Sequence, residues 1–321
     1  MRQPREIQFP MPWGQMAAQE WGDPNSPRKV LAIHGWMDNS NSFLKLFQLL
    51  PSDLHIISVD LCGHGLSSHR PLGCSYTILE HTIDMRRLVD HLRWEGFAII
   101  GHSMGAMIAF LLCGLYPDLV THLVSLDILT IMGCALSAIA DMTAFGINSM
   151  LAFEKKHGKP PVYKNLDEVI DRRMVTTPDS LTRESARIIL RRATVDYQGG
   201  VVLRTDPRLK HSRTLNYSFE DQLEILKRYR GRLLVLRANG ALHKDLKGLP
   251  YDKFISLYEE TCRVFKLVHI QGSHTVHLDE PEKVVDHIVD FLASYTGICT
   301  SASSQPQPQP TTESVAEQAK L

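Results

Sequence analysis

The segment FAIIGHSMG, residues 97–105, decides the fold, because it joins a short apolar run to a tight turn that carries a serine. The residues that follow, AMIAFLLCGLY (106–116), are apolar and helix-prone. GHSMG fits the pattern G-x-S-x-G, in which a sharp strand-to-helix turn exposes a nucleophilic serine. Gly101 and Gly105 allow the helix to pack close to the strand, and the helix N-terminus favours negative charge beside Ser103. We therefore predict Ser103 as a nucleophile; the alternative is a chance Gly-Ser-Gly loop.

Three more short apolar runs precede or follow this segment. They are KVLAI (29–33), HIISVD (55–60) and LVSLD (123–127). Runs of this length that are rich in Ile, Leu and Val, and mostly followed by glycine turns, are typical of buried parallel strands. Segment 77–94 between them has the apolar spacing of a helix. The alternation predicts an α/β fold with a mostly parallel central sheet and helices on both faces.

The alternation breaks over residues 130–218, which contain no convincing buried strand but do contain helix-prone stretches such as 179–194. It resumes at RLLVLR (232–237) and VFKLVHI (264–270), and it closes with a predicted helix at 281–295. We interpret 130–218 as a helical cap inserted between two strands. The alternative is a second layer of ordinary packing helices.

These patterns divide the chain of 321 residues into three parts. Residues 1–129 and 219–297 are expected to form an α/β core, which is long enough to bury a rigid interior. Residues 130–218 form the expected cap. Residues 298–321 are polar and rich in Pro and Gln, so we expect a disordered tail.

Composition excludes several classes of function. Lys plus Arg and Asp plus Glu both number 35, and this zero net charge argues against nucleic acid as a partner. The uncharged stretch 128–140 is too short to cross a bilayer, so no transmembrane segment is expected. The six cysteines are scattered and lack zinc-site spacing, and the N-terminus lacks a secretory signal, so we expect reduced thiols inside a cell. No cofactor or metal is expected.

A serine hydroxyl needs a base, and GSH (272–274) directly follows the predicted strand 264–270. We predict His274 as this base and as the later general acid. His277 is the competitor, and we interpret it as a packing or orienting histidine. A metal site at His274, His277 and Glu280 would need one helix to align all three side chains, whereas Gly272 and Pro281 favour a loop.

An oxyanion requires two backbone N–H donors. One is expected from Met104, the residue after the nucleophile. The other is expected from Trp36, in the Gly turn that follows strand 29–33. The alternative for this turn is that His34-Gly35 merely ends the strand.

The acid that orients His274 has two candidates. The loop after 232–237 carries only Asp245, which comes late. Asp127 stands at the end of strand 123–127 in an otherwise apolar stretch, where an unpaired carboxylate would be costly. We favour Asp127 as the acid and keep Asp245 as the alternative; Asp127 could also simply cap the next turn.

Four motifs occur in an order that resembles the α/β-hydrolase superfamily with a helical cap: HGWMDNSNSF, DLCGHGLSSHRP, GHSMG and GSHTVHLDEPE. The motifs HGWMDN, GHGLSSH and VVLRTDPRLK are more similar still to the serine hydrolase-like proteins of animals. The resemblance covers residues 5–295 and implies a triad of Ser103, His274 and an Asp. It also implies that the turn 60–67 is structural, with Asp60 and Ser67 making local hydrogen bonds and His64 outside the chemistry. It implies no defined substrate.

The expected reaction is hydrolysis of a carboxylic ester or thioester. Apolar residues of the cap suggest a small-molecule substrate with an apolar acyl or aryl group; they are Ile139, Met142, Phe145, Met150, Leu151 and Phe153. These residues could instead only pack the cap onto the core. A catalytically silent binding protein that kept the fold is the alternative function. Relatives that use an Asp nucleophile are disfavoured by Ser103.

The chain ends in Ala319-Lys320-Leu321, which has the small–basic–leucine form of the S-K-L peroxisomal address. The preceding Pro/Gln-rich segment would present it to an import receptor. We expect a peroxisomal protein, with the cytoplasm as the alternative location.

Overall fold

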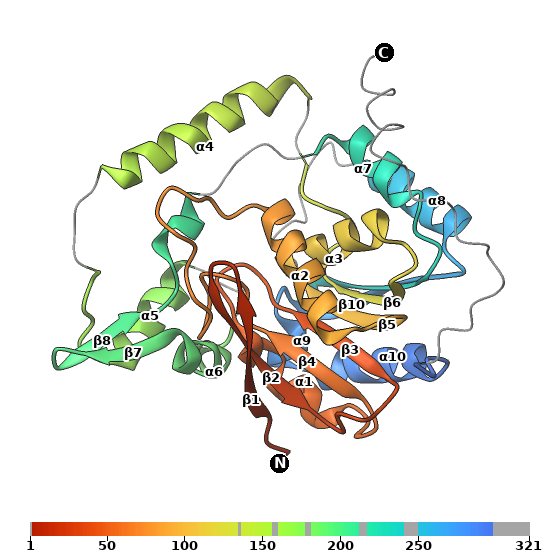
Figure 1. Cartoon of the computed structure of the whole chain (residues 1–321), viewed down its shortest axis with the longest axis horizontal. Helices are drawn as coiled ribbons and strands as arrows, with labels where there is room; N and C mark the ends of the chain where they lie inside the picture. The colour runs from red at the N-terminus through yellow and green to blue at the C-terminus, as the bar shows by residue number, and fades with distance from the viewer. Residues whose placement is uncertain are drawn as a thin grey trace.

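A central sheet of mixed direction forms the core of the computed structural model (Figure 1). The structure describes residues 2–133, 136–155, 160–176, 181–211, 217–240 and 250–297. Within these ranges the sheet has the order β1-β2-β4-β3-β5-β6-β9-β10. Its strands are β1 (Arg5–Met11), β2 (Gly14–Trp21), β4 (His55–Val59), β3 (Lys29–Ile33), β5 (Phe97–His102), β6 (Val120–Leu126), β9 (Arg232–Gly240) and β10 (Val264–Ser273). The pairs β1–β2 and β2–β4 are antiparallel and the others are parallel.

The apolar runs of the sequence form the six parallel strands, so the predicted α/β fold is confirmed. Five of these runs are buried because helices cover both faces of the sheet, which explains why they do not alternate with polar residues, whereas the run in the edge strand β10 is only partly buried. β5 continues two residues beyond FAII and ends at His102, directly before Ser103. The carboxyl ends of β3, β5, β6, β9 and β10 therefore meet at one edge, where an α/β sheet carries its site.

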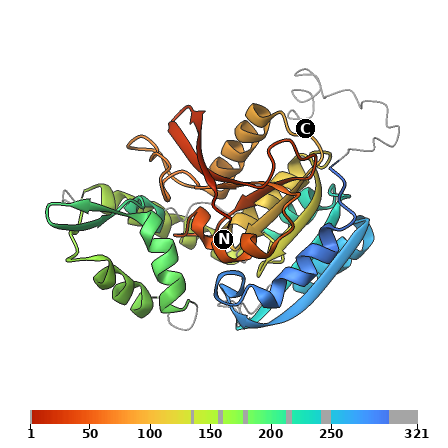
Figure 2. The ribbon, with the colours of Figure 1, turned by 90° about the horizontal axis from the view of Figure 1, so that it is seen from below.

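Helices cover the two faces of the sheet in two groups (Figure 2). One group packs into the first apolar cluster and comprises α2 (Ile78–Leu92), α3 (Met104–Leu115), α7 (Phe219–Leu226) and α8 (Tyr251–Thr261). α1 (Leu44–Leu49) and α10 (Glu282–Leu292) pack into the second cluster on the opposite face. α2 begins at a capping box, in which Thr77 and Glu80 satisfy each other's backbone N–H groups.

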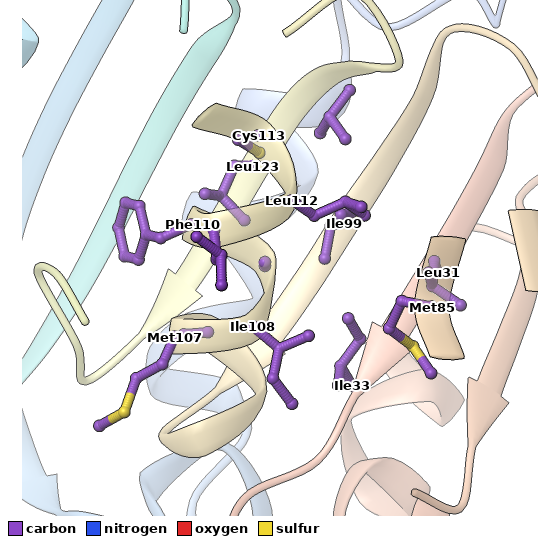
Figure 3. Close-up of a cluster of buried hydrophobic side chains, with 14 of the residues drawn as sticks. Leu31, Ile33, Met85, Ile99, Met107, Ile108, Phe110, Leu112, Cys113 and Leu123 are labelled. Carbon is purple, nitrogen blue, oxygen red and sulfur yellow. The ribbon is translucent and has the colours of Figure 1, made fainter. Parts of the chain in front are cut away.

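The helix that carries the nucleophile is almost entirely buried. α3 holds ten buried residues, among them Ile108, which lies toward Ile33, and Leu112, which lies toward Ile99 of the sheet (Figure 3). Each large apolar side chain buried in this way stabilises the fold by about 1.5–3 kcal/mol. The turn before α3 is therefore held on a rigid support.

The segment between β6 and α7 lies beside the sheet, at the left of Figure 1. Its described elements are η2 (Leu136–Ala138), α4 (Ile139–Glu154), α5 (Leu166–Thr176), α6 (Arg183–Ala193), β7 (Thr194–Tyr197), β8 (Gly200–Leu203) and η3 (Pro207–Lys210). α5 and α6 share a small apolar cluster of their own. The antiparallel hairpin β7–β8 adds two short strands to the predicted helical segment 130–218, and only Val202 of these strands is buried.

α4 contrasts with the other long helices because it stands away from the sheet (Figure 1). Gly146 is its one buried residue, whereas Phe145 is 62% exposed and Leu151 is 49% exposed. In the ranges that the structure describes, no helix combines the length and the apolar character needed to cross a membrane. Cys62, Cys74, Cys113 and Cys262 are free thiols; Cys134 and Cys299 lie outside the described residues.

Candidate active site

Ser103 occupies a strained turn between β5 and α3. Its backbone has φ 49° and ψ −118°, a conformation that costs an L-residue about 1–3 kcal/mol. Two glycines permit this turn. A Cβ on Gly105 would lie 2.0 Å from the carbonyl oxygen of Ile33, and one on Gly101 would lie 2.7 Å from Cα of Ala106. The G-x-S-x-G spacing therefore reflects a close approach of helix and sheet.

Asp127 follows β6, also with a positive φ of 68°. Its backbone N–H donates to the carbonyl of Leu236 at 2.8 Å, which ties the turn to β9. Its carboxylate Oδ1 accepts the N–H of Ala238 at 2.8 Å. The other oxygen, Oδ2, lies 2.6 Å from Nδ1 of His274. The structure thus brings together Asp127 and His274, which are 147 residues apart in the chain.

His274 directly follows β10 and is 7% exposed. Its carbonyl oxygen accepts a hydrogen bond from Nε2 of His102 at 3.0 Å, and the two rings lie 4.8 Å apart between centroids. Since His102 is the residue before Ser103, this contact places the His274 loop beside the turn of the nucleophile. With Nδ1 directed at Asp127, Nε2 of His274 is the nitrogen left to accept a proton.

The turn after β3 lies against the nucleophile. A Cβ on Gly35 would lie 3.2 Å from Cβ of Ser103. The N–H of Asp38 donates to the Gly35 carbonyl at 3.2 Å, which closes a turn with Trp36 and Met37 at its centre. The N–H of Met37 donates to Nε2 of His64 at 3.3 Å and is therefore engaged. The neighbouring N–H of Trp36 remains the donor that this turn can offer.

The second expected donor belongs to the start of α3. Met104 is the first residue of that helix, and the first N–H groups of a helix have no acceptor within it. Its N–H is therefore suited to an oxyanion beside Ser103. Trp36, the residue that supplies the first expected donor, is 48% exposed. Its indole Nε1–H donates to the carbonyl of Leu209 in η3 at 3.2 Å.

Comparison with known proteins places this chain in a family. The family model of the α/β hydrolase fold matches residues 29–154. The serine hydrolase-like protein of Danio rerio is 35% identical over 292 residues, covering 89% of this chain and 88% of that protein. The chain belongs to the serine hydrolase-like family of α/β-hydrolases.

Two further relatives extend this result. The serine hydrolase-like protein 2 of Homo sapiens is 28% identical over 296 residues, which covers 89% of this chain and 93% of that protein. A hypothetical protein of Pseudomonas aeruginosa PAO1 has a similar solved structure, with a TM-score of 0.78 and 29% identity over 90% of this chain and 99% of that one. The match covers both the sheet and the segment between β6 and β9.

Two buried histidines support the oxyanion turn of this serine hydrolase-like protein. Nδ1 of His34 lies 2.7 Å from the Gly35 carbonyl, and its Nε2 accepts the N–H of Leu61 at 3.0 Å. His64 accepts from Met37, and its Nδ1 lies 3.1 Å from the Cys62 carbonyl. Burial lowers the pKa of His34 to about 4 and that of His64 to about 3. Both therefore stay neutral, and His64 has a supporting place in the site.

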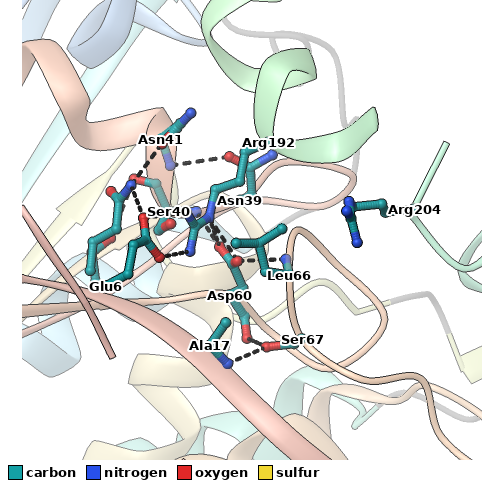
Figure 4. A network of polar contacts seen from close by, with 12 residues as sticks. Glu6, Ala17, Asn39, Ser40, Asn41, Asp60, Leu66, Ser67, Arg192 and Arg204 are labelled. Carbon is teal, nitrogen blue, oxygen red and sulfur yellow. Dashed lines mark hydrogen bonds and ion pairs between the residues drawn. The ribbon is translucent and has the colours of Figure 1, made fainter. Parts of the chain in front are cut away.

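Asp60 is the centre of a polar network between the core and α6 (Figure 4). Its carboxylate accepts the N–H groups of Ser40 and Leu66, each at 2.8 Å. Nε of Arg192 in α6 donates to it at 2.8 Å. Ser67 donates to the Asp60 carbonyl at 2.6 Å. The structure therefore gives Asp60 and Ser67 the local hydrogen bonds that the resemblance implied, and it adds Arg192.

His277 is buried in α9 (Val276–Asp279), and its Nε2 lies 3.0 Å from Oγ of Ser42. Burial holds its pKa well below the usual value for histidine. Its ring packs 4.1 Å from that of His102, so it has the surroundings of a packing residue. The described part of the chain contains no group of three or more His, Cys, Asp or Glu that could hold a metal. His274, His277 and Glu280 therefore do not form such a group.

Some predicted residues fall outside the structure's description. Asp245 lies in 241–249, and Ala319, Lys320 and Leu321 lie in the segment after residue 297. The alternative acid and the peroxisomal address therefore stay predictions. Sequence reasoning missed Asp38 and His102, although both stand inside motifs that it singled out.

Proposed function

We propose that this serine hydrolase-like protein hydrolyses a carboxylic ester or a thioester through an acyl-enzyme on Ser103. The observation that carries the proposal is the 2.6 Å contact between Asp127 and His274, placed beside the strained turn of Ser103. A carboxylate, an imidazole held by it and a half-buried serine beside them are the parts of a nucleophilic triad.

In the first step, Nε2 of His274 takes the hydroxyl proton while Oγ of Ser103 attacks the carbonyl carbon. Asp127 stabilises the imidazolium that forms and keeps its ring in the required orientation. The N–H groups of Trp36 and Met104 receive the negative charge on the former carbonyl oxygen. His274 then gives its proton to the leaving alcohol or thiol. A water molecule, activated by the same base, releases the acid in the second step.

The exposed apolar side chains of α4 favour an apolar acyl or aryl group as the substrate. A cavity of about 220 Å³ lies between α4 and η3, lined by Phe145 and by the polar residues Ser149, Lys210 and His211. It adjoins Leu209, whose carbonyl holds the Trp36 indole. Since most of the apolar side chains of α4 are not buried against the sheet, packing of the core does not account for them.

The test is covalent labelling of the full chain with a fluorophosphonate probe, followed by a panel of acyl esters and thioesters. We expect the wild type to be labelled and Ser103→Ala not to be labelled. Circular dichroism should show that both proteins are equally folded. A folded wild type that resists the probe would support the catalytically silent binding protein instead. Labelling that persists in Ser103→Ala would move the nucleophile to another residue.

A further inference from the structure

We propose that Asp38 and His102 form a second acid–histidine pair, which positions the main chain of His274 and links it to the cap through Arg173. The inference rests on the proposed function in one respect, the role of His274 as the base. The juxtaposition itself is structural: two Asp–His pairs, Asp127–His274 and Asp38–His102, meet at the carbonyl of His274.

His102 connects the two pairs. Its Nε2 donates to the His274 carbonyl at 3.0 Å, and its Nδ1 lies 3.6 Å from Oδ2 of Asp38. His102 is 1% exposed and Asp38 is 4% exposed, so water does not compete for these contacts. The carboxylate attracts Nδ1 while Nε2 donates to His274 when both ring nitrogens carry a proton, so the pair acts as an imidazolium beside a carboxylate. A histidine oriented by a carboxylate is the usual way to fix which nitrogen faces a partner.

The main chain at His274 needs such a contact because it lies in irregular structure. The pairing of β10 with β9 shifts register between Ile270 and Ser273, and the four-residue helix α9 follows at once. Asp127 holds the side chain of His274 but not its backbone. A displacement of about 1 Å at a catalytic group can cost roughly 100-fold in rate. The bond from His102 therefore fixes the main chain of the base, whereas Asp127 fixes its side chain.

Asp38 in turn contacts a positively charged side chain of the cap, that of Arg173. Nη2 of Arg173, on α5, lies 3.5 Å from Oδ1 of Asp38, and Oγ of Ser42 donates to Oδ2 at 3.4 Å. Burial opposes ionisation of this carboxyl, but the contact with His102 and the charge of Arg173 outweigh it and hold its pKa well below the usual value. The base is thus connected to a cap residue by a continuous chain of polar contacts.

The test compares substitutions of His102 with a matched control in the full chain. We expect His102→Phe to reduce the rate constant for fluorophosphonate labelling roughly 100-fold. His102→Gln should recover most of this loss, because its amide N–H can donate to the same carbonyl. His122→Phe is the control, because His122 is another buried histidine, packed against Phe291 and Tyr295 away from the site. It should label at the wild-type rate.

A second measurement does not depend on activity. The proton on Nδ1 of His274, which faces Asp127, gives a low-field NMR signal that Asp127→Asn identifies by its loss. We expect this signal to broaden in His102→Phe and in Asp38→Asn, and to be restored in His102→Gln. An unchanged signal in both His102→Phe and Asp38→Asn would overturn the positioning role. A wild type that shows the signal and its response but resists the probe would instead refute the proposed function alone.

Discussion

Oδ2 of Asp127 lies 2.6 Å from Nδ1 of His274, and this contact joins the ends of two strands that are not neighbours in the sheet. β9 runs between β6 and β10, and its Ala238 N–H donates to the second oxygen of Asp127. The side chain of Asp127 is 1% exposed and has partners on both carboxylate oxygens. The orientation of the imidazole is therefore set by β6, the strand before the inserted segment.

The first prediction concerns this acid. Asp127→Asn should lower kcat/KM for an aryl ester about 10⁴-fold, because an amide no longer selects the Nδ1–H form of His274. Steady-state hydrolysis measures the effect, with thermal unfolding to show that the variant folds. Asp245→Asn is the matched control and should stay within a few-fold of the wild type. A larger loss for Asp245 than for Asp127 would assign the acid to the loop after β9.

The second prediction concerns the strain at Ser103. Ser103→Ala keeps a Cβ at φ 49° and should unfold at nearly the same urea concentration as the wild type. Ser103→Gly relieves this conformation, so its free energy of unfolding should be about 1 kcal/mol higher than that of Ser103→Ala. Both variants lack the hydroxyl and should not react with a fluorophosphonate. Equal stability of the two variants would show that the turn stores no strain.

The sequence predicts the parallel strands well because a strand buried on both faces needs a continuous apolar run. Two hairpins escape this criterion. β1 and β2 lie at the edge of the sheet, where β1 exposes most of its residues. β7 and β8 are four residues each; β7 is mostly exposed and β8 is mostly half-buried. Their turn, Gln198-Gly199, has positive φ at both residues, and a glycine at this position is a sequence feature typical of a two-residue hairpin turn.

The candidate active site also has residues that the sequence predicts and residues that it does not. Ser103, His274 and Asp127 are predictable because each directly follows a parallel strand, and the carboxyl ends of such strands gather at one edge. The contact of Asp38 with Arg173 is not predictable, because it depends on how α5 sits over the core. His102 could have been suspected, since the residue before the nucleophile faces whatever loop carries the base.

The third prediction concerns the docking of α6. Arg192 donates to Asp60 and, at 2.6 and 2.8 Å, to both oxygens of Glu6. Arg192→Met leaves the carboxylate of Asp60 buried without a charged partner and should lower the free energy of unfolding by about 3 kcal/mol. Urea unfolding measures it. Arg187→Met, on the same helix, breaks only an exposed pair with Asp167 and should cost less than about 1 kcal/mol.

A double variant separates charge from shape in this network. Combining Arg192→Met with Asp60→Asn removes the uncompensated charge, so the pair should be more stable than Arg192→Met alone. A double variant that is less stable, by the sum of the two single losses, would show that the two residues contribute independently.

The last prediction is a dependence of stability on pH that originates at His34. In the folded protein its Nδ1 faces a carbonyl and its Nε2 accepts an N–H, and the second of these contacts requires the neutral ring. Burial lowers its pKa from 6.5 to about 4, so between these pH values the unfolded chain binds more protons at this residue than the folded one does. The stabilisation is complete above pH 6.5 and is lost as the pH falls toward 4, which amounts to about 2 kcal/mol between pH 7.5 and pH 5.

Urea unfolding at these two pH values should show that His34→Gln loses about 2 kcal/mol less than the wild type does, because an amide does not titrate. His287→Gln, at an exposed histidine of α10, should match the wild-type pH dependence. The same dependence in His34→Gln as in the wild type would assign the acid sensitivity to other buried histidines, such as His64.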